Sequence, residues 1–154
     1  MIDFITGQHI LELASNYPDP RAAVLPSLQL VQEELGFIPD EAIRVIARRL
    51  DVPEAEVFGT ATFYALLSRK PQGRHTISIC HNLPCSLLGA EPIIEHLGKR
   101  LGVGEGEVTQ DGRFSFRRIE CIGRCDGAPA MLVDADYHGN LTPEKMNSIL
   151  EQYD

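Results

Sequence analysis

The sequence lacks an apolar run of about 18 residues, the minimum length that a membrane-spanning helix needs. It also lacks a basic segment followed by an apolar stretch at its start, because MIDFITGQHI carries an acid where a signal peptide is basic. Low-complexity tracts, internal repeats and tryptophan are absent as well. These absences predict a protein without direct membrane insertion that lies in the cytoplasm, or on the cytoplasmic side of a larger assembly.

Positive charge is scarce in this chain. The 14 Lys and Arg residues are outnumbered by 22 Asp and Glu residues, which gives a net charge of −8. The basic residues gather only in short pairs, such as Arg48-Arg49 and Arg117-Arg118. A nucleic-acid-binding domain needs a basic face, so nucleic acid is not expected to be a partner.

The chain is expected to have two parts, divided at the turn-rich segment KPQGR of residues 70–74. Before this segment, apolar residues recur with helical spacing, and short helices with short connections predict a small bundle over residues 1–72. After it, alternating segments and helical segments follow one another, which predicts an α/β domain over residues 73–154. A chain of 154 residues can bury such cores without disulfide staples.

Within the first part, helices are expected over residues 22–35 and 39–50. Gly36 is the expected left-handed residue that ends the first of them. Asp51 is expected to cap the start of a third helix, which would carry the apolar run of residues 63–67.

Within the second part, one helix is expected over residues 86–101, with Leu87 and Leu88 on its buried face. Period-two alternation predicts the strands, and Thr142 is a good cap for the helix that closes the chain. The strands are expected over residues 76–80, 114–119 and 129–133, with 136–139 in a hairpin and the last helix over 143–150.

All four cysteines lie in the second part, as two pairs. Cys80 and Cys85 are separated by four residues, and Cys121 and Cys125 by three. Each pair follows a predicted strand. If those strands are neighbours, two loops at one end of the sheet present two thiolates each, which makes a four-sulfur site. In a reducing compartment such grouped cysteines indicate metal or redox chemistry rather than disulfides.

The cysteine spacing by itself leaves three kinds of site open. Four thiolates suit zinc or an iron–sulfur cluster, and the third interpretation is that the cysteines are reactive thiols without a metal. Structural zinc favours C-x-x-C, which neither pair has, whereas a [2Fe–2S] cluster is wider and accepts longer spacers. A thioredoxin-type redox pair is disfavoured because its motif is C-x-x-C, which is absent here. A Rieske centre needs two histidine ligands, and His81 is read here as a polar loop residue.

The spacer between Cys121 and Cys125 suits an anionic cluster. Gly123 allows a tight backbone turn beside a sulfur, so that amide N–H groups can point at it. Such donors stabilise the more negative, reduced form and raise the reduction potential. Arg124 is a candidate for offsetting the cluster charge, with a surface arginine that points away as the alternative.

Longer motifs resemble a known family. The segments C-HNLP-C-SLLGA, IE-C-IGR-C-DGAP and Y-HGNLTPEK, together with VFGTATFYALLSRKPQG before the first pair, are similar to the thioredoxin-like [2Fe–2S] subunit of respiratory NADH dehydrogenase, complex I. The same family serves NAD-reducing hydrogenases and NAD-linked formate dehydrogenases. The resemblance covers about residues 20–150, nearly the whole chain.

The resemblance implies a helical bundle followed by a thioredoxin-like domain, with one [2Fe–2S] cluster on Cys80, Cys85, Cys121 and Cys125. It implies an oxidoreductase subunit in the peripheral arm of a membrane-associated complex. Its partner would be a flavoprotein that binds FMN and NADH, with which the cluster exchanges single electrons. The equivalent subunit of a hydrogenase or formate dehydrogenase, a free shuttle ferredoxin and a zinc interaction module are the alternatives.

No catalytic site of its own is expected in this chain. Gly102, Gly104 and Gly106 follow a helix rather than a strand, so they predict a turn instead of a dinucleotide site. The helical part is expected to be the surface that docks the partner, with Phe58, Phe63 and Tyr64 as anchors.

Overall fold

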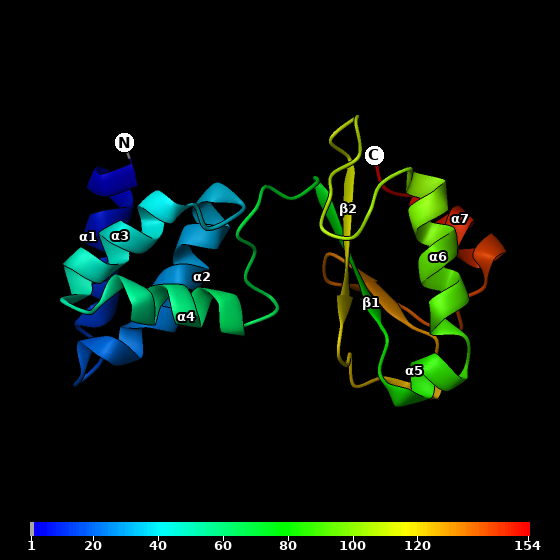
Figure 1. The fold of residues 1–154 in the computed structure, drawn as a ribbon, viewed down its shortest axis with the longest axis horizontal. Coiled ribbons are helices and arrows are strands. Elements are labelled where there is room, and N and C mark those ends of the chain that lie inside the picture. Colours follow the sequence, from blue (N-terminus) through cyan, green and yellow to red (C-terminus); the bar gives the residue numbers. More distant parts are fainter. Residues whose placement is uncertain (1) are drawn as a thin grey trace. The chain divides into compact units, whose positions relative to one another are not determined.

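The computed structural model describes residues 2–154, with side chains from residue 7 onward. The chain divides into two compact units, Met1–Pro71 and Gln72–Asp154, and each has a hydrophobic core of its own (Figure 1). In the described part of the chain, no helix is both long enough and apolar enough to cross a membrane.

The first unit is built from helices alone. Their apolar stripes meet in a core that includes Leu28, Val31 and Ile46, all fully buried. Gly36 ends α2 in the left-handed conformation, with φ of 78°, as the sequence predicts. The elements of this unit are α1 (Ile2–Ala14), the 3₁₀ turn η1 (Pro20–Ala23), α2 (Val24–Leu35), α3 (Asp40–Leu50) and α4 (Glu54–Phe63).

Two sequence-based expectations in this unit are wrong. Asp51 ends α3 instead of starting α4, because it takes a left-handed φ of 53° and its N–H bonds to the carbonyl of Ala47. Helix α4 stops at Phe63, so the segment 64–67 lies outside it. The reason is tertiary: the amide of Gln32 donates to the carbonyl of Leu66 at 3.0 Å, which holds this segment against α2 in a non-helical path.

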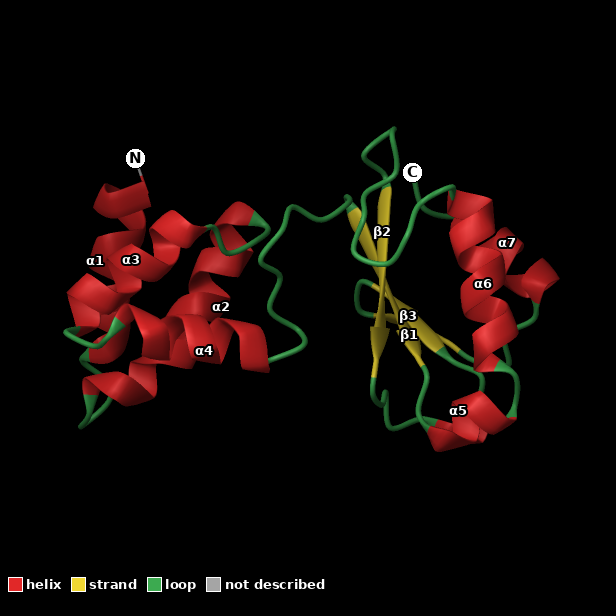
Figure 2. Ribbon diagram, viewed as in Figure 1, coloured by secondary structure: helices red, strands yellow, loops and turns green. Residues whose placement is uncertain are grey.

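The second unit is a four-stranded mixed sheet with helices on one face (Figures 1 and 2). Central strand β1 pairs in parallel with β2 and antiparallel with β3, which forms the predicted hairpin with β4. Helices α6 and α7 pack their apolar residues against Ile77, Ile79 and Met131 of the sheet. The strands are β1 (His75–Cys80), β2 (Phe114–Ile119), β3 (Met131–Val133) and β4 (Asp136–His138), and the covering helices are α6 (Ala90–Leu101) and α7 (Pro143–Leu150).

The helix expected over residues 86–101 is in fact two helices. A short helix, α5 (Leu83–Leu87), begins between the first two cysteines, where the side chain of Asn82 accepts the N–H of Leu83. Gly89, with φ of 93°, then redirects the chain before α6 begins. The helical period is therefore broken, and Leu87 and Leu88 are 77% and 61% exposed instead of buried.

Other helix ends agree with the sequence. Gly102 closes α6 in the left-handed conformation, which confirms a turn at this glycine. Thr142 caps α7, because its Oγ1 accepts the N–H of Lys145 at 3.2 Å.

Candidate functional site

The sheet brings the two cysteine loops to one edge. Strands β1 and β2 are adjacent and parallel, and Cys80 at the end of β1 pairs in register with Ile119 at the end of β2. Cys121 follows Ile119 by two residues, so both loops leave the sheet at its carboxyl edge. The expectation that these two strands are neighbours is confirmed.

The first pair is buried. Cys80 and Cys85 are 4% and 3% exposed and pack in a small apolar group with Ala90, Ala128 and Ala130. The two thiols are hydrogen-bonded to each other, and the Cys80 thiol also donates to the carbonyl of Glu120 at 3.6 Å. Burial, with a further contribution from that thiol–thiol hydrogen bond, raises the pKa of Cys85 to about 11.

The second pair lies at the surface. Cys121 and Cys125 are exposed, and Cys125 begins a 3₁₀ turn, η2 (Cys125–Gly127). Gly123 takes a left-handed φ of 77°, which turns its N–H toward the sulfur of Cys121 at 3.2 Å. The predicted tight turn with an amide aimed at a sulfur is therefore present.

The thiols converge in part. Cys80 and Cys85 are in contact, and Cys125 makes a small contribution to the raised pKa of Cys85, whereas the sulfur of Cys121 accepts a hydrogen bond from the N–H of Gly123. Within the described residues, no three His, Cys, Asp or Glu side chains are grouped so as to hold a metal ion. The donor set itself is four thiols with an apolar wall and an amide donor at a sulfur, and this chemistry fits an iron–sulfur cluster.

Two polar neighbours of the cysteines have defined positions. The Arg124 guanidinium lies over the ring of Tyr137, 4.3 Å from its centroid, and its Nε is 3.4 Å from Asp126. Arg124 is therefore held along the loop between Cys121 and Cys125, with an acid beside it that offsets part of its charge. His81 lies 3.6 Å from Glu120, as a polar loop residue does.

Sequence reasoning did not identify Tyr137 as part of the site. It comes from β4, twelve residues after Cys125, and packs against the apolar group around Cys80 and Cys85. A tyrosine in a short alternating hairpin carries no signal of this contact. The exposed Leu87 and Leu88 beside Cys85 were likewise not expected at the surface.

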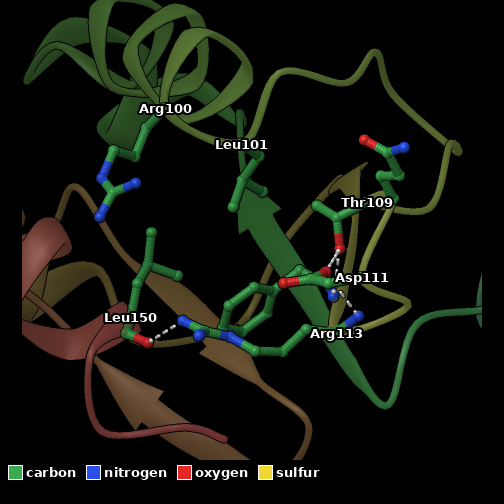
Figure 3. A pocket seen from close by; sticks show the side chains of 8 residues that line it. Arg100, Leu101, Thr109, Asp111, Arg113 and Leu150 are labelled. Carbon is green, nitrogen blue, oxygen red and sulfur yellow. Dashed lines mark hydrogen bonds between the residues drawn. The ribbon is translucent and has the colours of Figure 1, made fainter.

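A separate cavity of about 500 Å³ lies at the start of β2, the opposite end of the strand from the cysteines (Figure 3). Thr109 donates to Asp111 at 2.5 Å, and this hydrogen bond is the main reason that the pKa of Asp111 is lowered. Arg113 donates to the carbonyl of Leu150 at 2.9 Å and closes one side of the cavity. These contacts hold a loop and a helix end together, away from the thiols.

The four thiols are expected to differ in reactivity in protein prepared without iron. The exposed thiols, Cys121 and Cys125, should be alkylated by iodoacetamide before Cys85, because Cys85 is buried and at pH 8 only about one in a thousand of its thiols is ionised. The rate at Cys85 should rise about tenfold per pH unit up to a pH of about 11. Timed labelling followed by peptide mass spectrometry measures the order, and equal rates at Cys85 and Cys121 would contradict it.

Known proteins resemble this chain over most of its length. The model of the thioredoxin-like [2Fe-2S] ferredoxin family matches residues 10–154. The E subunit of NADH-quinone oxidoreductase from Pseudomonas aeruginosa is 42% identical over 138 residues, which are 90% of this chain and 83% of the relative. The corresponding protein of Escherichia coli K12, with the same name, is 43% identical over the same length and the same shares.

A solved structure shares the fold. An NAD+-reducing [NiFe]-hydrogenase in the air-oxidized state superposes with a TM-score of 0.69 and 22% identity. The match covers 84% of this chain but only 22% of the hydrogenase chain, so this chain spans about a fifth of that protein's length. At this identity the likeness concerns the fold alone.

Proposed function

Because this chain belongs to the thioredoxin-like [2Fe–2S] ferredoxin family and, within it, to the E subunits of NADH-quinone oxidoreductases, we propose that it exchanges single electrons with the FMN of a partner flavoprotein. Family membership confirms the predicted α/β fold class, with its thioredoxin-like domain, and the predicted place among oxidoreductase subunits. The function at the level of the family is that of an electron-transfer subunit with a [2Fe–2S] cluster.

The proposed ligands are Cys80, Cys85, Cys121 and Cys125. The observation that carries this choice is the parallel pairing of β1 with β2, which sends both cysteine loops out of one edge of the sheet. A bound cluster would supply one-electron redox chemistry at this edge. The surrounding alanines exclude water from the first pair, and the Gly123 N–H offsets negative charge on the Cys121 sulfur.

The partner and the setting follow from the same family. NADH delivers its two electrons to a flavin and a [2Fe–2S] cluster accepts one at a time, so the proposed partner is a flavoprotein that binds FMN and NADH, and we place it beside the cysteine edge. The assembly would be the cytoplasmic, peripheral arm of a membrane-associated complex. A quinone-linked complex is preferred to a hydrogenase, because the relatives at 42–43% identity are NADH-quinone oxidoreductase subunits and the hydrogenase likeness is one of fold.

Exposed apolar side chains support the proposal that the helical unit docks the flavoprotein. Phe63 is 81% exposed and packs edge-on against Tyr64, with ring centroids 5.2 Å apart. Phe58 is half exposed and lies under the guanidinium of Arg69 at 4.7 Å. Aromatic side chains that remain outside a core are typical anchors of protein interfaces.

The test begins with metal analysis. Protein purified without oxygen should contain two irons and two acid-labile sulfides per chain, with a rhombic EPR signal that appears only on reduction. It should co-purify with an FMN-containing protein encoded in the same organism, and NADH should reduce the cluster in that assembly. Zinc without sulfide would contradict the cluster, and a loaded chain that binds no flavoprotein would contradict the proposed partner.

A further inference from the structure

The hydroxyl group of Tyr137 lies at the edge of the proposed cluster site. It is buried, and within the described residues it has no hydrogen-bond partner. Nearly all buried hydroxyl groups in proteins are paired, because leaving one unpaired is unfavourable. The ring of Tyr137 packs against the apolar group that contains Cys80 and Cys85. An unpaired donor therefore lies in contact with the surroundings of the proposed ligands.

Two glycines make room for this hydroxyl. A Cβ atom built on Gly127 or on Gly139 would collide with Oη of Tyr137. Neither glycine is among the described residues with a left-handed φ, so the backbone conformation at these two positions does not itself require glycine. A side chain at either position would therefore displace the hydroxyl, and Gly127 lies two residues after Cys125 in the second cysteine loop.

The phenol also contacts the same loop through its ring face. The guanidinium of Arg124, the residue before Cys125, stacks on the ring at 4.3 Å from the centroid. The carbonyl of Gly127 accepts the N–H of Asn140, which follows β4, at 2.5 Å. The ring face contacts the loop at Arg124, and the hydrogen bond from Asn140 holds it at Gly127, against which the hydroxyl fits. These contacts lie on both sides of Cys125.

We propose that Tyr137 is a positioning residue for the iron–sulfur cluster: it braces the loop of Cys121 and Cys125, and its hydroxyl donates a hydrogen bond to a sulfur on the Cys125 side. This inference rests on the proposed function, in which the four cysteines hold a [2Fe–2S] cluster. Thiolate and sulfide sulfurs accept hydrogen bonds, and a bound cluster supplies the acceptor that the buried hydroxyl otherwise lacks.

The expected consequence is a change in reduction potential. A donor to a cluster sulfur stabilises the reduced form more than the oxidised form, because the reduced form carries one more negative charge. Tyr137→Phe removes the hydroxyl and keeps the ring and its stack with Arg124. The oxidised form should then gain about tenfold over the reduced form, a potential lower by about 59 mV for a one-electron couple.

The experiment is an EPR-monitored redox titration of the full chain, with iron and sulfide assayed on each sample. The matched control is Tyr153→Phe, because the hydroxyl of Tyr153 lies in the same unit but bonds to His138 and Asp136, both at 3.0 Å. Tyr137→Phe should load iron and sulfide like the wild type, titrate at a lower potential and show altered g values. Tyr153→Phe should titrate like the wild type.

A second variant covers the case in which Tyr137→Phe loads poorly. Gly127→Ala keeps the phenol but displaces its hydroxyl, and it should also lower the potential, whereas Gly59→Ala, with open space around its Cβ, should not. A loaded Tyr137→Phe or Gly127→Ala protein with an unchanged potential and unchanged g values overturns the inference. A wild-type chain without iron and sulfide would overturn the proposed function, and this inference with it.

Discussion

Replacing Cys85 with alanine should abolish the cluster while leaving the fold in place. The side chain is buried among Ala90, Ala128 and Ala130, so a smaller apolar residue fits its surroundings. Without one of four ligands, iron and sulfide are expected to fall below about a tenth of the wild-type content, and the EPR signal of the reduced protein should disappear. Metal analysis, visible absorption and far-UV circular dichroism on the same sample measure both parts of the expectation.

The matched control is Ser86→Ala, which changes the exposed neighbour of Cys85 in the same helix. It should retain full iron and sulfide. A Cys85→Ala protein that keeps a stoichiometric cluster would remove Cys85 from the ligand set. Because the chain has only four cysteines, a four-thiolate site would then be ruled out as well.

Truncation of the two cores should have separate effects. Leu28 and Met131 are both fully buried, the first in the core of the helical unit and the second in the core beneath the sheet. Each change to alanine should cost about 2–5 kcal/mol of unfolding free energy, because it removes buried methylene groups and leaves a cavity. For units of this size that cost corresponds to a fall in Tm of roughly 10 °C or more.

Calorimetry combined with visible absorbance distinguishes the effects of the two variants. Leu28→Ala should lower the unfolding transition of the helical unit and leave the cluster absorbance intact. Met131→Ala should lower the temperature at which the cluster absorbance is lost. Met131 lies in β3 and pairs with Ile79 of β1, the residue before Cys80. Leu66→Ala, at an exposed side chain, should change stability by less than about 0.5 kcal/mol. Loss of the cluster in Leu28→Ala at the same temperature as unfolding of its own unit would show that the cores are not independent.

The sequence alone determined the features that depend on nearest neighbours along the chain. The alternation before Cys80 and before Cys121 predicted β1 and β2, and the spacers predicted a glycine turn with an amide at a sulfur. Gly36 and Thr142 marked helix ends because their conformational and hydrogen-bonding preferences are local. The four cysteines, and with them the metal or redox chemistry that the site can support, could be identified from the sequence for the same reason.

Only the tertiary structure decided where those features meet. The segment after Phe63 left its helix because a hydrogen bond from Gln32, far away in the chain, outweighed a continuous apolar period. The helix expected over residues 86–101 broke at Gly89, whose left-handed conformation the apolar period does not reveal. The pairing of β1 with β2 joined segments about 40 residues apart and so brought both cysteine loops to one edge. Strand β4 places the hydroxyl of Tyr137 beside the second cysteine loop, in the space that two glycines of different turns leave open. Such contacts depend on how separate elements pack, and the local pattern of a sequence does not contain that information.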